Sequence, residues 1–354
     1  MKYLLLILLS FTGTIQAQET EIQAPIRNFE KLWDTFSERY ANFSEKGVDW
    51  QQVYQAYRPL IDSSTTNEEL FEVCCRMVQE LNDGHVTIDP GFNSEIECGP
   101  PYDFQFEGEF PTAQDRMKFA AVLDKTLAAH GFSAPVRIEL DEETNFQYRV
   151  SDAFGYLRLD EMTEKNTYGK FARSLDQAIG AFQDKEAVII DLLFNGGGWD
   201  HISYVLASRL ILKGTEVGHF VRTRQKGKDT YTPMKFKQVK ARGKNQYVQP
   251  IVILTSDFTA SAAEVFLLLM LDLPHVTIVG DTTEGIFSDM YEFKLPNNWE
   301  VSLSHQQFFS QKMVNYEGKG IPPDVRVLNT RKDIQRQKDA VMEAAISFLQ
   351  QGSE

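Results

Sequence analysis

Thr255-Ser-Asp-Phe-Thr-Ala-Ser-Ala-Ala-Glu264 lies between two apolar runs, at residues 250–254 and 265–271. The first run is typical of a buried strand, and the second predicts a helix that begins at or near Ser261. A hydroxyl at that point lies beside unpaired helix N–H groups, where an oxyanion could be stabilised. The same residues fit the S-x-x-E capping box, which serves only to start a helix. This segment alone therefore allows either a nucleophile or a structural cap.

A second apolar strand, residues 187–194, runs directly into Asn195-Gly-Gly-Gly198. Such a continuous apolar run is typical of a parallel strand covered on both faces. Consecutive glycines allow positive φ and close backbone approach, and their N–H groups can point at an anion. Neither of the glycine patterns that bind nucleotide phosphates can be read here, whereas a simple tight turn remains an alternative.

His85 has the sequence context that best suits a general base. It follows Asp83-Gly84, a turn signal, between a helical stretch and a short β-like run. The other five histidines are His130, His201, His219, His275 and His305, and we interpret most of them as structural.

Five motifs in a fixed order resemble the C-terminal processing (tail-specific) peptidase family, and within it the tricorn-core type. Its D-G-H, D-x-R-x-N-G-G-G, T-x-S-A-[AS]-E, G-x-x-T-x-G and E-x-x-G-[IV]-x-P-D motifs match residues 83–85, 191–198, 259–264, 280–285 and 317–324. The resemblance extends over roughly residues 29–328. It implies an α/β fold with a crotonase-like βαβ core and an N-terminal helical domain. It also implies a peptide or protein substrate, no cofactor and no metal.

The resemblance also implies roles for individual residues. Ser261 would be the nucleophile, His85 the base, and Glu317 a residue that helps to hold the imidazole. The oxyanion would be bound by main-chain N–H groups of Ala262 and Gly197, the latter with Gly196 and Gly198 as neighbours.

Three positions depart from the family pattern. Ile286 stands where many members have a catalytic lysine, so a Ser–Lys dyad is not expected. Leu193 replaces the usual arginine before the glycine loop, which puts a local ion pair in doubt. Gly84 stands where the tricorn type has a serine that bridges to the glutamate. A water could bridge instead, Glu317 could reach His85 directly, or the orienting role could be lost.

An alternative function of another class is a non-catalytic protein on the same fold that binds small apolar ligands or peptides. The three departures would then mark a loss of catalysis. The match at Ser261, His85, Glu317 and the glycine loop favours the peptidase.

The 354-residue chain has a formal net charge of −14, from 50 acidic and 36 basic residues. Nucleic acid is an unexpected partner, because phosphate binding relies on clustered cations. One short basic group, at residues 222–228, is more typical of a solvated loop. Of the three cysteines, one of Cys74 and Cys75 could bond to Cys98, although free thiols are the preferred interpretation.

The N-terminus predicts export. Met1-Lys2 precedes a short apolar run, residues 3–9, and a small-residue cleavage site after Ala17. The run is too short to span a bilayer. We therefore expect a signal peptide at residues 1–17, a periplasmic or extracellular mature protein, and no stable membrane insertion.

The spacing of apolar residues predicts the organisation of the mature chain. It indicates an N-terminal helical domain over residues 18–90, a connecting region with short strands over 91–150, an α/β catalytic core over 151–330, and a C-terminal helix over 331–354. Within the connecting region, residues 90–118 are expected to be irregular. This interval is too short for a PDZ domain, so no tail-binding module is expected there.

Overall fold

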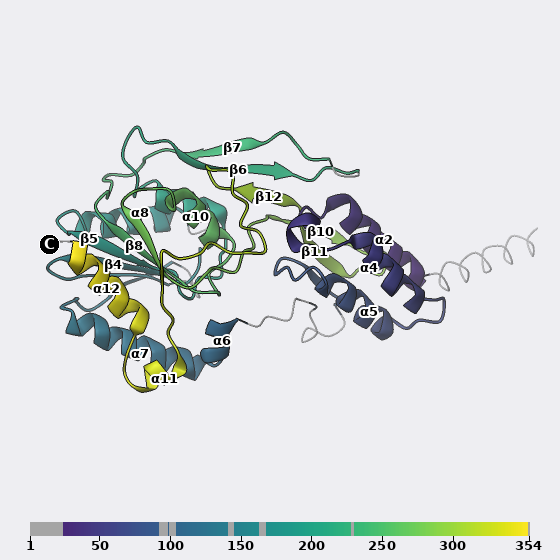
Figure 1. The fold of residues 1–354 in the computed structure, drawn as a ribbon, viewed down its shortest axis with the longest axis horizontal. Helices are drawn as coiled ribbons and strands as arrows, with labels where there is room; N and C mark the ends of the chain where they lie inside the picture. Colours follow the sequence, from purple (N-terminus) through teal and green to yellow (C-terminus); the bar gives the residue numbers. More distant parts are fainter. Residues whose placement is uncertain are drawn as a thin grey trace, which may run out of the picture. The chain divides into compact units, whose positions relative to one another are not determined.

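A computed structural model describes residues 24–91, 98, 104–140, 145–162, 168–227 and 230–352. The chain divides into two compact units (Figure 1). Unit 1 takes residues 1–102, 222–233 and 288–307, and unit 2 takes residues 103–221, 234–287 and 308–354. The predicted signal peptide lies outside the described residues.

Unit 1 combines helices from the start of the chain with a hairpin from its last quarter. Its strand β11 pairs antiparallel with both β1 and β10, in the register Thr87↔Ser302 and Glu292↔Ser302. The helices are α2 (Ala24–Arg39), α3 (Phe43–Lys46), α4 (Trp50–Tyr57), the 3₁₀ turn η1 (Arg58–Leu60) and α5 (Asn67–Gln79). The strands are β1 (Thr87–Asp89), β10 (Met290–Lys294) and β11 (Glu300–Ser304).

The helices of unit 1 form where the sequence predicts them. Phe29, Leu32 and Phe36 recur at three- and four-residue steps along α2 and are fully buried. Thr66 and Glu69 form a capping box that starts α5. The same core includes Trp299 from the hairpin, so this unit is not built from the N-terminal region alone.

Unit 2 is built around a seven-stranded sheet in the order β13-β9-β8-β5-β4-β3-β2. Neighbours from β4 to β13 are parallel, whereas β2 and β3 add antiparallel strands at one edge. The strands are β2 (Val136–Glu139), β3 (Asn145–Val150), β4 (Phe154–Leu159), β5 (Ala187–Asp191), β8 (Ile251–Thr255), β9 (Val276–Gly280) and β13 (Val325–Arg326). A separate pair, β6 (Val217–Thr223) and β7 (Lys235–Val239), is antiparallel, and β6 also neighbours β12 (Gln306–Phe309).

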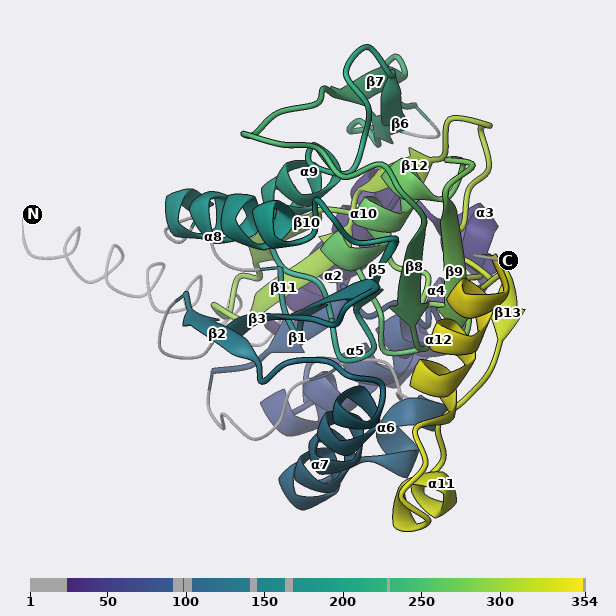
Figure 2. The same ribbon diagram turned by 90° about the vertical axis from the view of Figure 1, so that its left-hand side faces the viewer.

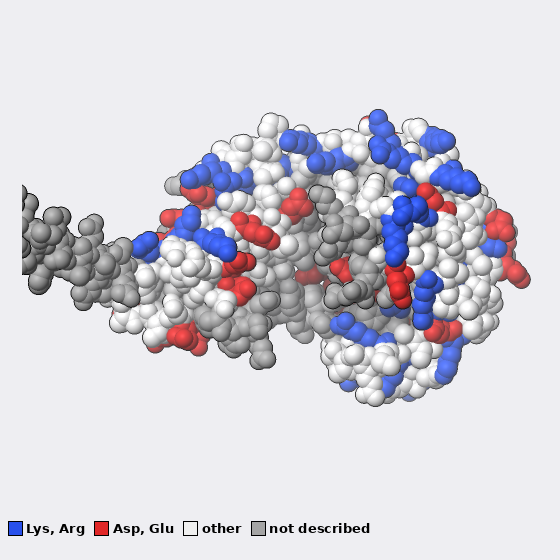
Figure 3. Space-filling view, turned by 180° about the vertical axis from the view of Figure 1, so that it is seen from behind, with Lys and Arg blue, Asp and Glu red and all other residues white. Residues whose placement is uncertain are grey.

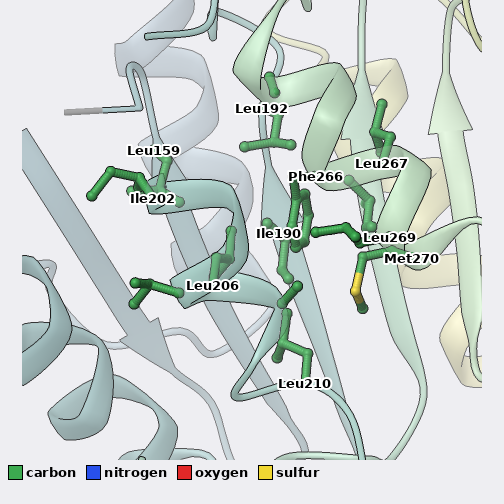
Figure 4. Close-up of a cluster of buried hydrophobic side chains, with 14 of the residues drawn as sticks. Leu159, Ile190, Leu192, Ile202, Leu206, Leu210, Phe266, Leu267, Leu269 and Met270 are labelled. Carbon is green, nitrogen blue, oxygen red and sulfur yellow. The ribbon is translucent and has the colours of Figure 1, made fainter. Parts of the chain in front are cut away.

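Helices cover both faces of this sheet, as Figure 2 shows. Alternation along β5 directs Ile190 toward one core and Ile189 toward the other. The first core, drawn in Figure 4, is shared with α8 (Tyr168–Ala181), α9 (Asp200–Ala207) and α10 (Ala262–Met270). The second is shared with α6 (Gln105–Glu109), α7 (Ala113–Ala129), α11 (Arg331–Gln335) and α12 (Ala340–Gly352).

The predicted α/β fold and its parallel βαβ units are confirmed, with two local differences. The short helix α6 and the 17-residue helix α7 lie in the region for which the sequence predicts only an irregular connection up to residue 118 and short strands. Thr112 starts α7 by accepting a hydrogen bond from the Asp115 N–H. The C-terminal helix is divided into α11 and α12, because Asp339 accepts from the Met342 N–H and begins a new helix.

Two further expectations concern the pairing of the cysteines and the presence of membrane-spanning helices. Cys74, Cys75 and Cys98 are all free, which confirms the preferred interpretation. Within the described ranges, no helix has the length and apolar character needed to cross a membrane.

Candidate active site

Ser261 occupies the turn between β8 and α10, as the sequence predicts. Its backbone has φ 53° and ψ −119°, a conformation that residues other than glycine rarely adopt. An ordinary N-cap residue has an extended backbone with negative φ, so a cap does not require this geometry. Strain of this kind costs about 1–3 kcal/mol and is concentrated at functional sites. The backbone of Ser261 therefore favours a role beyond capping.

Glu264 holds this turn in place. Its carboxylate accepts hydrogen bonds from the N–H of Ser261 at 3.2 Å, of Gly285 at 2.8 Å and of Ile286 at 2.9 Å. It also accepts from the Thr283 hydroxyl at 2.5 Å. The side chain is fully buried, and burial raises the pKa of Glu264 to about 7. The sequence identified this residue only as half of a capping box.

The glycine loop lies against the candidate nucleophile. A Cβ placed on Gly197 would lie 2.6 Å from the Ser261 Cβ and 3.1 Å from the Ala262 nitrogen. Gly197 has φ +107°, a further reason why only glycine fits there. The predicted proximity of the glycine loop and the start of α10 is therefore observed within unit 2.

Asn195 determines which N–H groups of that loop are engaged. Its Oδ1 accepts from the Gly197 N–H at 2.9 Å, and its Nδ2 donates to the Leu159 carbonyl at 3.0 Å. Its own carbonyl accepts from the Ala260 N–H at 3.1 Å, next to Ser261. The preferred oxyanion donor, Gly197, is thus already hydrogen-bonded. The N–H groups of Gly196, Gly198 and Ala262 have no partner among the described residues.

Glu317 is connected by hydrogen bonds to the turn that carries Ser261. Its Oε2 accepts from the Phe287 N–H at 3.1 Å, and the preceding residue, Ile286, accepts from the Ser261 N–H at 3.0 Å. Glu317 is buried. Two neighbouring main-chain residues, Ile286 and Phe287, therefore connect it by hydrogen bonds to the candidate nucleophile. The side chain of Ile286 is apolar and cannot serve as a base.

His85 belongs to unit 1, where a buried carboxylate holds its loop. Asp83 accepts from the His85 N–H at 2.9 Å, from the Tyr40 hydroxyl at 2.7 Å and from the Ser304 hydroxyl at 3.2 Å. Burial lowers the pKa of His85, although the Asp83 charge opposes that shift. Its Nδ1 is buried without a hydrogen-bond partner among the described residues. A neutral imidazole with such a nitrogen can accept a proton.

The position of the missing family arginine has a local substitute. Leu193 is buried in the core, and its N–H donates to Asp191 Oδ1 at 3.0 Å. Arg158 faces Asp191 across the neighbouring strand, and its charge lowers the pKa of that carboxyl. Burial is the larger effect and leaves the pKa of Asp191 raised. A cation from β4 thus lies near this carboxylate although Leu193 carries none.

A pocket of about 590 Å³ borders the glycine loop within unit 2. Phe194 and Phe258 form its apolar wall, and the guanidinium groups of Arg116 and Arg158 lie over the Phe194 ring at 6.0 and 5.3 Å. Asp160 also lines the pocket and accepts from Arg158 Nε at 2.6 Å. This space can receive part of a ligand next to Ser261. In the described part of the chain, no group of three or more potential ligands could hold a metal ion.

Comparison with known proteins identifies the family. Residues 153–327 match the model of peptidase family S41, and residues 26–79 match the tricorn protease C1 domain. The chain belongs to peptidase family S41. This confirms the resemblance to C-terminal processing peptidases and places the chain in a family of serine-type peptidases.

Curated relatives of this S41 chain are C-terminal processing proteases. The carboxyl-terminal-processing protease of Synechocystis sp. is 26% identical over 222 residues, which are 62% of this chain and 48% of the relative. The carboxy-terminal-processing protease of Bartonella bacilliformis is 27% identical over 227 residues, 61% of this chain and 49% of the relative. The chain thus spans about half the length of the curated relatives that it matches.

Solved structures extend the similarity across most of the chain. A protein from Parabacteroides merdae, proposed to be a peptidase, has a TM-score of 0.73 and 26% identity, covering 92% of this chain and 96% of that one. Mature CPAF complexed with lactacystin has a TM-score of 0.63 and 13% identity, with 93% and 98% covered. The tricorn protease has a TM-score of 0.53 and 12% identity, with 94% and 37% covered. The last two support the fold alone.

Proposed function

We propose that this S41 protein is an exported serine peptidase that hydrolyses peptide bonds through an acyl-enzyme formed on Ser261. Ser261 Oγ attacks the scissile carbonyl carbon while His85 takes the hydroxyl proton. His85 then gives this proton to the departing amine as the C–N bond breaks. Water subsequently attacks the ester, with His85 as the base, and releases the acid and the free serine.

The observation that carries this proposal is the strained backbone of Ser261 next to main-chain N–H groups that have no partner in the described part of the chain. The strain needs a function to explain it, and capping does not supply one. The N–H of Ala262 also begins helix α10, whose dipole favours negative charge there. These features together suit the oxyanion of a tetrahedral intermediate.

The engaged Gly197 N–H changes one detail of the mechanism expected from the sequence. We assign the oxyanion site to the Ala262 N–H together with a loop N–H from Gly196 or Gly198. Gly197 instead admits the Ser261 side chain, because a Cβ on Gly197 would clash with it. Removal of one such donor elsewhere costs on the order of 3 kcal/mol in transition-state stabilisation.

His85 and Ser261 belong to different units, so the mechanism requires the working enzyme to bring the imidazole to the hydroxyl. Glu317 is proposed to hold the imidazole in its productive orientation, directly or through water. Export rests on the predicted signal peptide at residues 1–17, and periplasmic or extracellular proteins or peptides are the proposed substrates.

A serine-reactive phosphonate tests the proposal and its alternative. The wild-type protein should be labelled at Ser261 and should hydrolyse unfolded protein substrates, whereas Ser261→Ala should do neither while remaining folded. His85→Ala should slow labelling strongly. A folded wild-type protein that is neither labelled nor active would favour the non-catalytic binding protein.

A further inference from the structure

Strand β7 and the segment that follows it carry a concentration of positive charge in unit 2. No Asp or Glu occurs between residues 230 and 256, a stretch with five cations in a chain of net charge −14. All five side chains are exposed, and none forms an ion pair with a described residue. They are Lys235, Lys237, Lys240, Arg242 and Lys244. We call these five the β7 basic group.

This group lies at the edge of a sheet. Among the described strands β7 pairs only with β6, so its other side offers main-chain N–H and C=O groups to a further strand. Figure 3 shows blue Lys and Arg side chains along the upper edge of the molecule, the edge at which Figure 1 places β7. Lysines on an edge strand repel a second copy of the same strand. The same charges attract an extended chain that carries acidic side chains.

The β7 basic group continues into a pocket of about 380 Å³. Lys240 and Arg242 line this pocket together with Tyr168, His201 and Tyr204. The His201 ring lies 6.2 Å from Tyr168 and 5.9 Å from Tyr204, so the three form a continuous aromatic wall. Among the described residues that line this pocket none is acidic, whereas Asp160 and Glu161 line the pocket beside the glycine loop.

We propose that the outer edge of β7 and this aromatic pocket form a docking site for an extended acidic peptide segment. The peptide would add a strand to β7 through main-chain hydrogen bonds, which provide affinity without sequence preference. Its carboxylates would pair with the β7 basic group, and an apolar side chain would enter the aromatic pocket. The acidic remainder of the chain repels such a segment and so directs it to this edge.

Strand pairing distinguishes a peptide from other polyanions. A phosphate backbone or an anionic lipid headgroup can neutralise the lysines, but it has no alternating N–H and C=O groups to match an edge strand. The peptide is therefore the occupant that uses both the charge and the exposed main chain. The more compact basic cluster in the sequence, at residues 222–228, is a different group.

The docking site can be tested separately from the chemistry at Ser261. The full-length Ser261→Ala protein is titrated with a labelled ten-residue peptide in which Glu alternates with Val, and binding is followed by fluorescence anisotropy. Replacement of every Glu by Gln, or addition of Lys240→Glu and Arg242→Glu, should raise the Kd about tenfold or more. The matched control, Lys332→Glu with Lys338→Glu, reverses two exposed charges on and after α11 and should leave the Kd unchanged.

Two further probes decide the mode of binding. N-methylation of alternate residues on one edge of the peptide keeps its charge but removes its donors, and it should abolish binding. Single-stranded DNA and vesicles containing an anionic phospholipid should bind more weakly than the peptide. Equal binding of these polyanions, or no effect of N-methylation, would overturn the peptide assignment. Equal effects of the two double charge reversals would overturn the location.

Discussion

The main-chain N–H of Ser261 donates a hydrogen bond to Oε2 of Glu264 at 3.2 Å. The same carboxylate accepts from Thr283, Gly285 and Ile286 on the segment after β9. One buried acid therefore joins the strained serine, the first turn of α10 and a loop that is distant in sequence. Its hydrogen bonds provide the constraint that a rarely adopted backbone conformation needs in order to persist.

Replacement of Glu264 should expose this dependence. In Glu264→Gln, an amide NH2 replaces one acceptor oxygen, so buried N–H groups lose their partner. We expect the free energy of unfolding to fall by about 2–3 kcal/mol, because each unsatisfied buried group costs about 1–3 kcal/mol. Urea unfolding measures this change, and a variant as stable as the wild type would contradict it.

The pH dependence of stability offers a second test of the same residue. Burial raises the pKa of Glu264 from 4.5 to about 7, so the folded state retains a proton that the unfolded state loses. The contribution of Glu264 to stability is therefore full below pH 4.5 and is lost as the pH rises through 7. A shift of this size corresponds to roughly 3 kcal/mol. Glu264→Gln should lack this decline, whereas parallel curves for the two proteins would argue against the assignment.

Two substitutions of Ser261 separate strain from chemistry. Ser261→Ala keeps a Cβ at positive φ and should leave stability close to that of the wild type. Ser261→Gly relieves the strain, and it should stabilise the fold by about 1 kcal/mol after the entropy cost of glycine. Both should be inactive. Thermal unfolding of the two variants gives the comparison, and a Gly variant less stable than the Ala variant would show that the turn is not strained.

Asn195 should act on the rate through the glycine loop. Asn195→Ala leaves the Gly197 N–H and the Leu159 carbonyl without their side-chain partner, and the loop can then turn. We expect the turnover rate to fall about 100-fold or more while KM changes less, since about 3 kcal/mol follows the loss of an oxyanion donor. Asn245→Ala, a half-buried asparagine in another loop, is the control. Unchanged phosphonate labelling of Asn195→Ala would refute this role.

The fall in activity at acid pH should reflect protonation of His85, and we call this part of the pH–activity profile the acid limb. The imidazole must be neutral to act as a base, and burial holds its pKa below 6.5. The limb should therefore lie below pH 6.5. Asp83→Asn removes a charge that raises this pKa, so the limb should move to lower pH. Tyr40→Phe keeps the charge and should lower the rate without moving the limb; a shift in that variant would mean that the limb reports another group.

The regular elements were largely predictable because their causes are local. The apolar steps along α2, the continuous apolar strand β5 and the S-x-x-E pattern each lie within a few residues of sequence. The helix α7 was not predicted, because residues 90–118 are rich in glycine, proline and aromatics and the whole interval 91–150 was interpreted as a connection with short strands. Its N-cap, Thr112, was the signal that could have located its start.

The interior of the candidate site could not be derived in the same way. Motif positions indicated Asn195 and Glu264, but their partners are Leu159, Thr283 and Gly285, which only the fold brings near. The spacing of apolar residues predicts only that Tyr40 packs in the core; the hydrogen bond from its hydroxyl to Asp83 had no local signal, because 43 residues separate the two in sequence. The preference for the Gly197 N–H failed to anticipate that a neighbouring side chain would occupy that donor first.

The pairing of β1 with β11 has a consequence for how the protein is made. Thr87 contacts Ser302, which lies 215 residues further along the chain. Every residue up to Ser302, the Ser261 turn included, must therefore be present before the strand that follows His85 can acquire its neighbour. Closing such a long loop is slow. The folding chain thus contains Ser261 for some time before the loop of His85 is anchored, and on the proposed mechanism such a delay would keep the unfinished protein from cutting its surroundings.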